Sequence, residues 1–229
     1  MIFDLDTRQS DSPFVEQIWR AHSVHSGMLN SVSTNRWEMV VSHRDGKTFF
    51  TIRGPHTTSE SLFLLPDGDW VGIRFKIGAF MPQSPPGSLR NSDRTLPNAG
   101  DRSFWLDSTA WQFPDFENAD TFVSRLVKGG LLVRDPVIDG VMRGEVSELS
   151  PRSIQRRFLQ TTGLTQSTIH QIERARSAMV ALQQGKPILD VVHEAGYYDQ
   201  PHLTRALKRW LGETPAELAG LSRFGQVSV

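Results

Sequence analysis

The amino-acid sequence predicts an α+β protein, in which a β-rich amino-terminal half is followed by an all-α carboxyl-terminal half. Two observations lead to this prediction. From about Trp37 to Ile77, apolar and polar residues alternate with the period of two that is typical of strands with one buried face. From Asn118 onward the apolar period is that of helices, and glycines, prolines and capping residues divide the chain into short helical segments.

Length and composition limit the classes of protein to consider. The chain has 229 residues, 38% of them hydrophobic, which is ordinary for a packed protein of one large or two small domains. Apolar runs such as 62–65 are far shorter than the roughly 20 residues of a membrane-spanning helix, and residues 1–20 contain acids where a signal peptide would be basic. We therefore expect a cytoplasmic protein that does not enter a membrane.

Cysteine is absent, which excludes disulfides, thiolate metal sites and cysteine nucleophiles. The formal net charge is zero, with about −2 on residues 1–130 and +2 on residues 131–229. This balance argues against a protein that coats nucleic acid indiscriminately, so any basic site must be local.

The β-rich half begins with a predicted hairpin. "WEMVVSH" and "KTFFTIR" flank Asp45-Gly46, a pair that favours the positive φ angles of tight hairpin turns. Residues 62–65 predict a further strand. In "WVGIRFKI", Val71, Ile73, Phe75 and Ile77 share one face, as in a strand with one solvated side. Residues 82–103, with four prolines and two glycines, predict an irregular loop.

The helical half is divided by its caps. A helix from Asn118 should end at Gly129-Gly130, and the change of composition places a domain boundary near 115–130. Ser150-Pro151 and Gly163 bound a second helix, and a long helix over 165–184 ends at Gly185. Short helices over 188–195 and 199–211 follow, and Thr214 to Glu217 form a capping box that opens the last one.

Two of these helices have polar, basic outer faces. On 151–160, Ile154 and Phe158 share the apolar face, while Arg152, Gln155 and Arg156 lie opposite, with Arg157 on the flank. On 199–211, Leu203, Leu207 and Trp210 lie opposite a face that carries His202, Thr204, Arg205, Lys208 and Arg209, with Gln200 in the first turn. Arginine can donate two hydrogen bonds to guanine and glutamine can pair with adenine, so this is chemistry that reads a DNA major groove.

Amphipathic surface helices also occur in ordinary proteins, so the pattern alone leaves that alternative open. What favours DNA is the repetition: each polar helix follows a short helix and a tight turn. The helix over 165–184 between them would span about 30 Å, close to the ~34 Å rise of one DNA turn. Two such helices could therefore enter successive major grooves.

These residues lead to a family resemblance. Residues 136–222, notably "SPRSIQRRFLQTTGLT" and "ERARSAMVALQQGKPILDVVHEAGYYDQPHLTRALKRWLGETP", resemble the double helix-turn-helix domain of AraC/XylS-type transcriptional regulators. The family pattern has counterparts here at Arg157-Phe158, Gly163, Arg174-Ala175, Ala195-Gly196-Tyr197, Leu203, Gly212 and Pro215.

The resemblance implies residue roles. Base contacts would fall on Arg152, Gln155, Arg156, Gln200, Pro201, His202, Thr204 and Arg205, of which Pro201 can offer only an apolar contact. Phosphate contacts would come from Arg157, Lys208 and Arg209. The first unit departs from the family at Ser147-Glu148, where a small residue is common, so its turn should be built differently.

The amino-terminal half resembles the β-rich, often cupin-like sensor domain of such regulators, which binds a small molecule, dimerises, or both. The resemblance divides the chain into a sensing or dimerisation domain (1–115), a helical connector (116–135), the DNA-binding domain (136–222) and a tail (223–229). A helical stretch over 104–130 would join the sensor half to the DNA-binding half. A ligand pocket would be lined by Trp37, Met39, Phe49, Trp70, Phe75 and Phe80. The alternative is that these residues only fill the core of a small barrel.

No enzyme, metal or cofactor is predicted. His22, His25, His43 and His56 lack the tight His-x-His and Glu cluster of metal-binding cupins. The acid pairs Glu38/Asp45 and Asp67/Asp69 lack a matching nucleophile, and neither a GxSxG elbow nor a phosphate-binding glycine loop is present.

The sequence therefore predicts a sequence-specific regulator of transcription that binds double-stranded DNA. A small-molecule effector, RNA polymerase and a second copy of the chain are the further partners that the resemblance suggests. The alternative is a cupin-like small-molecule-binding or isomerase-type protein whose helices bind another protein. That alternative would require apolar anchors on the outer face of 199–209, where the sequence has His, Thr, Arg and Lys.

Overall fold

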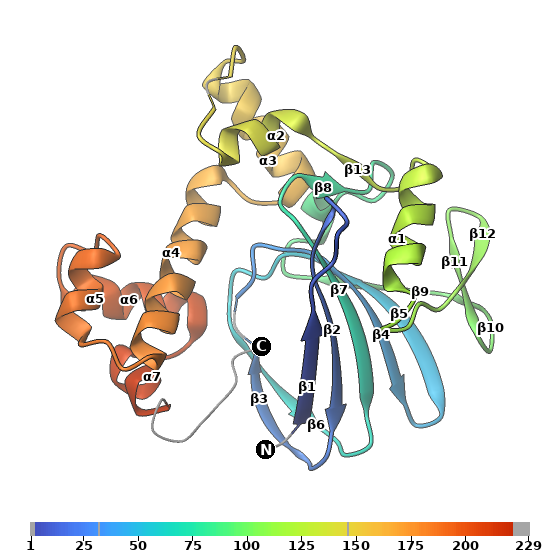
Figure 1. Cartoon of the computed structure of the whole chain (residues 1–229), viewed down its shortest axis with the longest axis horizontal. Coiled ribbons are helices and arrows are strands. Elements are labelled where there is room, and N and C mark those ends of the chain that lie inside the picture. Colours follow the sequence, from blue (N-terminus) through green and yellow to red (C-terminus); the bar gives the residue numbers. More distant parts are fainter. Residues whose placement is uncertain (1–2, 32, 146, 222–229) are drawn as a thin grey trace. The chain divides into compact units, whose positions relative to one another are not determined.

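The computed structural model describes residues 3–31, 33–145 and 147–221 (Figure 1). Strands occupy most of the chain up to Gln112, and from Ala119 the described elements are helices, apart from one two-residue strand. This order confirms the predicted α+β class, with a β-rich region followed by a helical one. In the described part of the chain, no helix is long and apolar enough to cross a membrane.

The central element is a six-stranded antiparallel sheet with the strand order β1-β2-β7-β4-β5-β9. Its strands are β1 (Phe3–Arg8), β2 (Val15–Ser23), β7 (Asp69–Phe75), β4 (Glu38–Arg44), β5 (Lys47–Arg53) and β9 (Asp93–Leu96). The predicted hairpin between β4 and β5 is confirmed, with Asp45 and Gly46 at φ values of 52° and 68°.

Aromatic side chains fill the core on one face of this sheet. Phe50 on β5 stacks on Phe104 with 3.8 Å between ring centroids, and Trp37 stacks on Phe75 at 4.1 Å. Phe122, from α1 (Ala119–Lys128), meets Phe50 edge to face at 6.0 Å. The first helix therefore packs on the same core as the sheet.

Two sequence predictions were wrong between Pro82 and Lys128. Residues 82–103 are not an irregular loop, because they contain a 3₁₀ helix, η1 (Pro86–Leu89), the edge strand β9 and β10 (Asn98–Gly100). Residues 104–130 are not helical throughout, because β11 (Ser103–Leu106) and β12 (Thr109–Gln112) precede α1. β9 has the sequence "DRTL", which becomes a strand because β5 supplies a partner and not because of its own pattern.

Smaller pairs of strands complete the β-rich region. β3 (Gly27–Ser31) pairs with β6 (Glu60–Leu64), which confirms the strand predicted at 62–65, and β8 (Ala79–Phe80) pairs with β13 (Val133–Arg134). β1 and β2 were not predicted; the residues of β2 alternate irregularly, whereas those of β1, "FDLDTR", do alternate.

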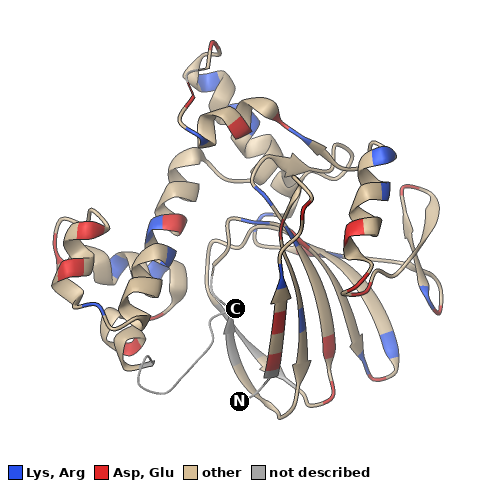
Figure 2. Ribbon diagram, in the orientation of Figure 1, with Lys and Arg blue, Asp and Glu red and all other residues tan. Residues whose placement is uncertain are grey.

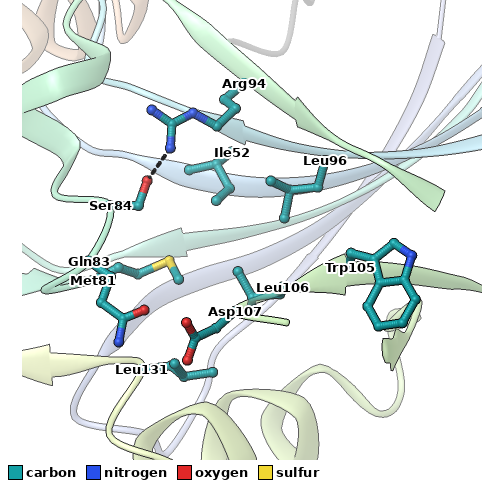
Figure 3. Close-up of a pocket in the computed structure, with 10 residues that line it drawn as sticks. All are labelled: Ile52, Met81, Gln83, Ser84, Arg94, Leu96, Trp105, Leu106, Asp107 and Leu131. Atoms are coloured by element: carbon teal, nitrogen blue, oxygen red, sulfur yellow. Dashed lines mark hydrogen bonds between the residues drawn. The ribbon is translucent and has the colours of Figure 1, made fainter. Parts of the chain in front are cut away.

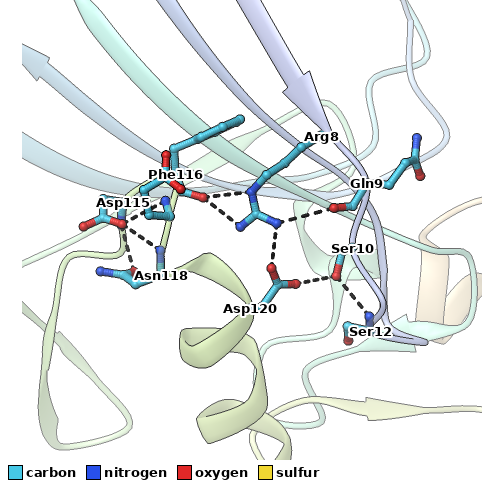
Figure 4. A network of polar contacts seen from close by, with 9 residues as sticks. Arg8, Gln9, Ser10, Ser12, Asp115, Phe116, Asn118 and Asp120 are labelled. Atoms are coloured by element: carbon cyan, nitrogen blue, oxygen red, sulfur yellow. Dashed lines mark hydrogen bonds and ion pairs between the residues drawn. The ribbon is translucent and has the colours of Figure 1, made fainter.

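A polar cluster fixes the first strand to α1 (Figure 4). Arg8 donates from Nε and Nη2 to the carbonyl oxygen of Phe116 at 3.0 and 2.7 Å, and from Nη1 to Asp120 Oδ2 at 2.6 Å. Ser10 donates to the other carboxylate oxygen of Asp120. Burial pushes the pKa of Asp120 up, but the hydrogen bonds from Ser10 and Arg8 and the charge of Arg8 outweigh it, so the pKa lies below its usual value.

The remaining helices are α2 (Pro136–Met142), α3 (Pro151–Thr162), α4 (Gln166–Gln183), α5 (Ile188–Glu194), α6 (Gln200–Leu211) and α7 (Pro215–Leu221). The bounds of α3 to α7 lie within about two residues of the predicted ones. At the start of α7, Thr214 and Glu217 exchange hydrogen bonds reciprocally, which confirms the capping box.

The chain divides into two compact units. The first comprises 1–29, 36–55 and 63–165, and the second 30–35, 56–62 and 166–229. The first unit thus contains the main sheet together with α1, α2 and α3, and the second contains α4 to α7. The domain boundaries drawn from the sequence follow composition and stay a prediction.

The Asp120 cluster should make stability depend on pH. A carboxyl group whose pKa is lowered by folding stabilises the folded state above its unfolded pKa of about 3.9, and this contribution is lost as pH falls through the folded value. Because Asp120 is part-exposed, we expect Asp120→Asn to cost about 0.5–1 kcal/mol of unfolding free energy at pH 7. Urea denaturation at several pH values should show that difference shrinking between pH 5 and pH 3; a constant difference would contradict the assignment.

Candidate nucleic-acid interface

Helix α3, the first of the two predicted DNA-reading helices, is fixed at both ends. Ser150 Oγ accepts from Ser153 N–H at 3.2 Å, and Pro151 fits the first turn because proline lacks an N–H. Gly163 ends the helix at a φ of 73°, the left-handed conformation that favours glycine. Phe158 is fully buried, so the rotation of α3 about its axis is set by the core.

The opposite face of α3 is free. Arg152, Gln155 and Arg156 are exposed, and their side chains make no hydrogen bond or ion pair with any other described residue. The structure therefore places three of the predicted base-contacting residues together on one solvated face, as the 3.6-residue period of the helix requires.

Arg157 differs from these three. Its Nη1 donates to Asp135 Oδ2 at 2.8 Å, and the Asp135 side chain is only 6% exposed. Asp135 is also the N-cap of α2, since its Oδ1 accepts from Val137 and Ile138. The side chain predicted to contact phosphate thus ties α3 to the start of α2, while 44% of its surface stays exposed.

The described residues between α2 and α3 form a connection with its own contacts. Gly144 takes a φ of 80° after α2 ends, and Arg143 donates to Glu145 at 2.7 Å, a hydrogen bond that lowers the pKa of Glu145. Ser147 Oγ accepts from Leu149 N–H at 3.2 Å. Among the described residues of this connection, Gly144 is left-handed and Glu148 is not.

In the second unit, α5 and α6 form a tighter pair. Gly196 between them has a φ of 69°, and Asp199 caps α6 by accepting from His202 N–H at 2.7 Å. Arg174 on α4 lies over the Tyr197 ring, 4.3 Å from its centroid. Burial raises the pKa of the Tyr197 phenol, against the opposing effect of Arg174. Arg174 and Tyr197 thus hold the turn against α4 and do not face outward.

Like α3, helix α6 has one buried apolar face and one exposed polar face. Leu203, Leu207 and Trp210 are buried. Gln200, Arg205, Lys208 and Arg209 are exposed, and His202 and Thr204 are half-buried (Figure 2 colours the basic positions). The side chains of Gln200 and Arg205 make no hydrogen bond or ion pair with another described residue.

Three predicted contact residues on α6 have local partners. Thr204 Oγ1 donates to the Gln200 carbonyl oxygen at 2.9 Å, and Arg209 stacks over Trp210 at 4.5 Å. His202 Nδ1 accepts from Tyr198 N–H at 3.3 Å. In the neutral ring the proton then sits on Nε2, which is left as a donor.

The end of α6 is held within the second unit as well. The Trp210 carbonyl oxygen accepts from Ser33 N–H at 3.1 Å. Gly212 ends the helix at a φ of 78°, and a Cβ there would come within 2.5 Å of Ser59 Oγ. Sequence reasoning found the caps of α3 and α6, but it missed Asp135, although Asp135-Pro136 repeats the cap-and-proline pattern of Ser150-Pro151.

The six residues predicted to line a ligand pocket are dispersed. Trp37, Met39 and Phe75 are buried in the core of the sheet. Phe49 lies under Arg44 and, like Trp70 and Phe80, is partly exposed. The cavity in this region has other lining residues (Figure 3), so the proposed pocket stays a prediction. Among the described residues, no group of three or more His, Asp or Glu side chains could hold a metal ion; His22 pairs with Asp69 at 2.8 Å.

Comparison with known proteins matches residues 145–220 to a family of helix-turn-helix domains. No curated protein matches the chain.

Among solved structures, ToxT from Vibrio cholerae O395 bound to (E)-4-(8-methylnaphthalen-1-yl)but-3-enoic acid aligns over 97% of this chain and 100% of its own, at 10% identity and a TM-score of 0.43. A 1.65 Å structure of ToxT from Vibrio cholerae aligns over 96% and 99%, at 9% identity and a TM-score of 0.40. We draw no conclusion about function from these two structures. The match to helix-turn-helix domains over residues 145–220 is the finding used below.

The double role of Asp135 can be tested by denaturation. Asp135→Ala removes both the cap of α2 and the partner of Arg157, and we expect it to cost about 1–2 kcal/mol of unfolding free energy. Arg157→Ala leaves the cap in place and should cost less. The double variant should be no less stable than Asp135→Ala within about 0.5 kcal/mol, because the same ion pair is lost; fully additive losses would show that the two residues act separately.

Proposed function

We propose that this chain, whose residues 145–220 are a helix-turn-helix domain of the AraC type, is a transcription regulator that binds specific sequences of double-stranded DNA. The observation that supports this most directly is the free polar face on each of two helices, α3 and α6. Each face lies opposite buried apolar residues and between defined caps. Side chains that donate to no other described residue are available to donate to base edges.

The contact that we propose for each residue follows from the chemistry of its side chain. Arg152, Arg156 and Arg205 have free forks that suit guanine O6 and N7, and Gln155 and Gln200 suit adenine. His202 can donate from Nε2. The side chains of Thr204 and Pro201 are shorter and would contact only groups close to the helix. Lys208 and Arg209 lie on the later turns of α6 and would bind phosphates, together with the donors of Arg157 that Asp135 leaves free.

Helix α4 supports the proposal that two grooves are read. It has 18 residues, so it is about 27 Å long at 1.5 Å per residue. That length is of the order of the ~34 Å rise between successive major grooves on one side of the duplex. The repeated design of α3 and α6 is what a bipartite site of this kind requires.

We further propose that the β-rich region controls DNA binding, by taking up a small molecule or by pairing with a second copy. RNA polymerase would be the partner through which a bound regulator acts. A small-molecule-binding or isomerase-type protein with a protein-binding tail would need apolar anchors on the outer face of α6. That face instead carries Arg205, Lys208 and Arg209.

Base-reading residues should govern sequence preference. The cognate duplex can be selected from a random pool with the full chain. Arg156→Ala and Arg205→Ala should each weaken binding to it by about 1–3 kcal/mol, with relaxed preference at one base pair. Unchanged preference in both variants, measured by repeating the selection, would refute their assignment. Arg102→Ala, an exposed arginine in the turn between β10 and β11, is the matched control.

A phosphate-contacting residue should act differently. Lys208→Ala should weaken binding to cognate and unrelated duplexes by similar factors, because a phosphate contact carries no sequence information. The slope of log K against log salt should fall by about one, since one fewer counterion is released. Titrations at four salt concentrations measure it; an unchanged slope would place Lys208 outside the interface.

A further inference from the structure

Tyr198 lies in the turn between α5 and α6, directly before Asp199, the N-cap of α6. Its side chain is 91% exposed, more than any other large apolar or aromatic side chain of the described residues. Its hydroxyl makes no hydrogen bond with another described residue. A single exposed aromatic ring is ordinary on a protein surface, so exposure alone indicates no function.

Packing of the helix does not explain this tyrosine. An apolar residue directly before an N-cap commonly packs on the fourth residue of the helix, which fixes how the chain enters it. In α6 that fourth residue is Leu203, which is fully buried, whereas Tyr198 is exposed. The inner position is taken by Tyr197, which is only 5% exposed. The fold therefore gains almost no buried area from the Tyr198 ring.

The main chain around Tyr198 is held on both sides. Tyr198 N–H donates to His202 Nδ1 at 3.3 Å, and Asp199 accepts from His202 N–H at 2.7 Å. The Tyr197 ring meets the His202 ring edge to face, with 5.2 Å between centroids, and lies under Arg174. Because these contacts fix the backbone, the side chain of Tyr198 leaves the turn in a constant direction. With two side-chain torsions, a tyrosine also loses little conformational entropy on binding.

Several main-chain donors at the start of α6 are not free to bind a phosphate, as they are at other helix N-termini. The N–H groups of Tyr198 and His202 are already bonded, and Pro201 has none. The carboxylate of Asp199 would also repel a phosphate that approached the main chain closely. The phenol hydroxyl of Tyr198 is an uncharged donor at the end of a long side chain, so it can hold a phosphate further from the main chain.

Helix α3 offers a comparison, because its caps recur in α6. The N-caps Ser150 and Asp199 are 49 residues apart, and so are the left-handed glycines that end the two helices. With this offset, Tyr198 corresponds to Leu149, which is 37% exposed and has no donor on its side chain. A hydroxyl donor directly before the N-cap is thus a feature of α6 that α3 does not share.

In the proposed complex with DNA, Tyr198 would lie at the edge of the major groove. The second helix of a helix-turn-helix unit enters the groove with its N-terminal residues, while the first helix crosses the sugar-phosphate backbone. Tyr198 is in the turn that joins the two helices, so a phosphate is the DNA group closest to it. Tyrosine is among the side chains that donate to phosphate oxygens, and such contacts fix the register of a protein on the duplex.

We propose that the Tyr198 hydroxyl donates to a backbone phosphate at the edge of the half-site that α6 reads, and that this contact fixes the position of α6 in the groove. The inference rests on the proposed function, because it requires α6 to enter a major groove. It adds an uncharged residue to the basic ones proposed to bind phosphates. An uncharged donor displaces no counterion, so its loss should weaken binding without changing the salt dependence.

Tyr198→Phe tests the hydroxyl alone. On the duplex selected with the full chain, this variant should bind about tenfold more weakly. The slope of log K against log salt should stay that of the unmodified chain, in contrast to Lys208→Ala. The base preference should not change, because a phosphate contact carries no sequence information. Urea denaturation should show unchanged stability, since the side chain is almost fully exposed.

Tyr198→Ala separates the ring from the hydroxyl. It should lose no more affinity than Tyr198→Phe, because the proposed contact is made by the hydroxyl. Trp105→Ala, which removes an exposed aromatic ring on β11, is the matched control and should leave DNA binding unchanged.

Duplexes in which single phosphates are replaced by uncharged methylphosphonates identify the acceptor. The half-site of α6 is located by the base pair at which Arg205→Ala relaxes the preference. One replacement at the edge of this half-site should weaken binding of the unmodified chain about tenfold. The same replacement should leave Tyr198→Phe nearly unaffected, because the hydrogen bond is already lost.

Tyr198→Phe that binds as tightly as the unmodified chain would overturn the phosphate contact. If only Tyr198→Ala bound weakly, the ring would be the contacting group and the proposal would be wrong. Losses that simply add for Tyr198→Phe and every methylphosphonate would overturn it as well. All three results leave the proposed function standing. Failure of the full chain to bind any selected duplex would instead overturn the proposed function, and this contact with it.

Discussion

A helix can offer a constant set of donors to a ligand only if its rotation and both of its ends are fixed. In α3 this is achieved by Ser150 at the start, by Gly163 at the end and by the buried ring of Phe158. In α6, Asp199, Gly212 and the buried Leu203 have the same functions. The capping and buried residues fix the direction of the side chains on the outer faces, so the proposed function depends on the caps and the core.

A helix or strand could be predicted from the sequence where the residues that determine it lie close together in the chain. The residues that cap α3 to α7 adjoin these helices in the sequence, so the bounds of the helices could be predicted from it. β2 and β9 could not, because their residues alternate poorly and they become strands by pairing with β7 and β5, which are distant in the sequence. The polar sequence of β9 and the prolines around it suggested a loop.

The same distinction applies to the candidate interface. Arg152, Gln155 and Arg156 share a face because of helical periodicity alone, which sequence captures. The pairing of Arg157 with Asp135 joins residues 22 positions apart, and only the fold brings them together. Of the residues predicted to surround a ligand, Trp37, Met39 and Phe75 lie in the core, whereas Phe49, Trp70 and Phe80 are partly exposed. An alternating pattern cannot distinguish residues that fill a core from residues that line a pocket.

The attachment of β1 by Arg8 and Ser10 has a practical consequence for shortened forms of the protein. β1 forms one margin of the main sheet and covers β2 along Ile18 to Ser23. Removing the first ten residues would uncover the main-chain N–H and C=O groups of β2, and unpaired strands of this kind recruit strands from other molecules. An amino-terminally trimmed chain would therefore be prone to aggregate even with every side chain proposed to contact DNA intact.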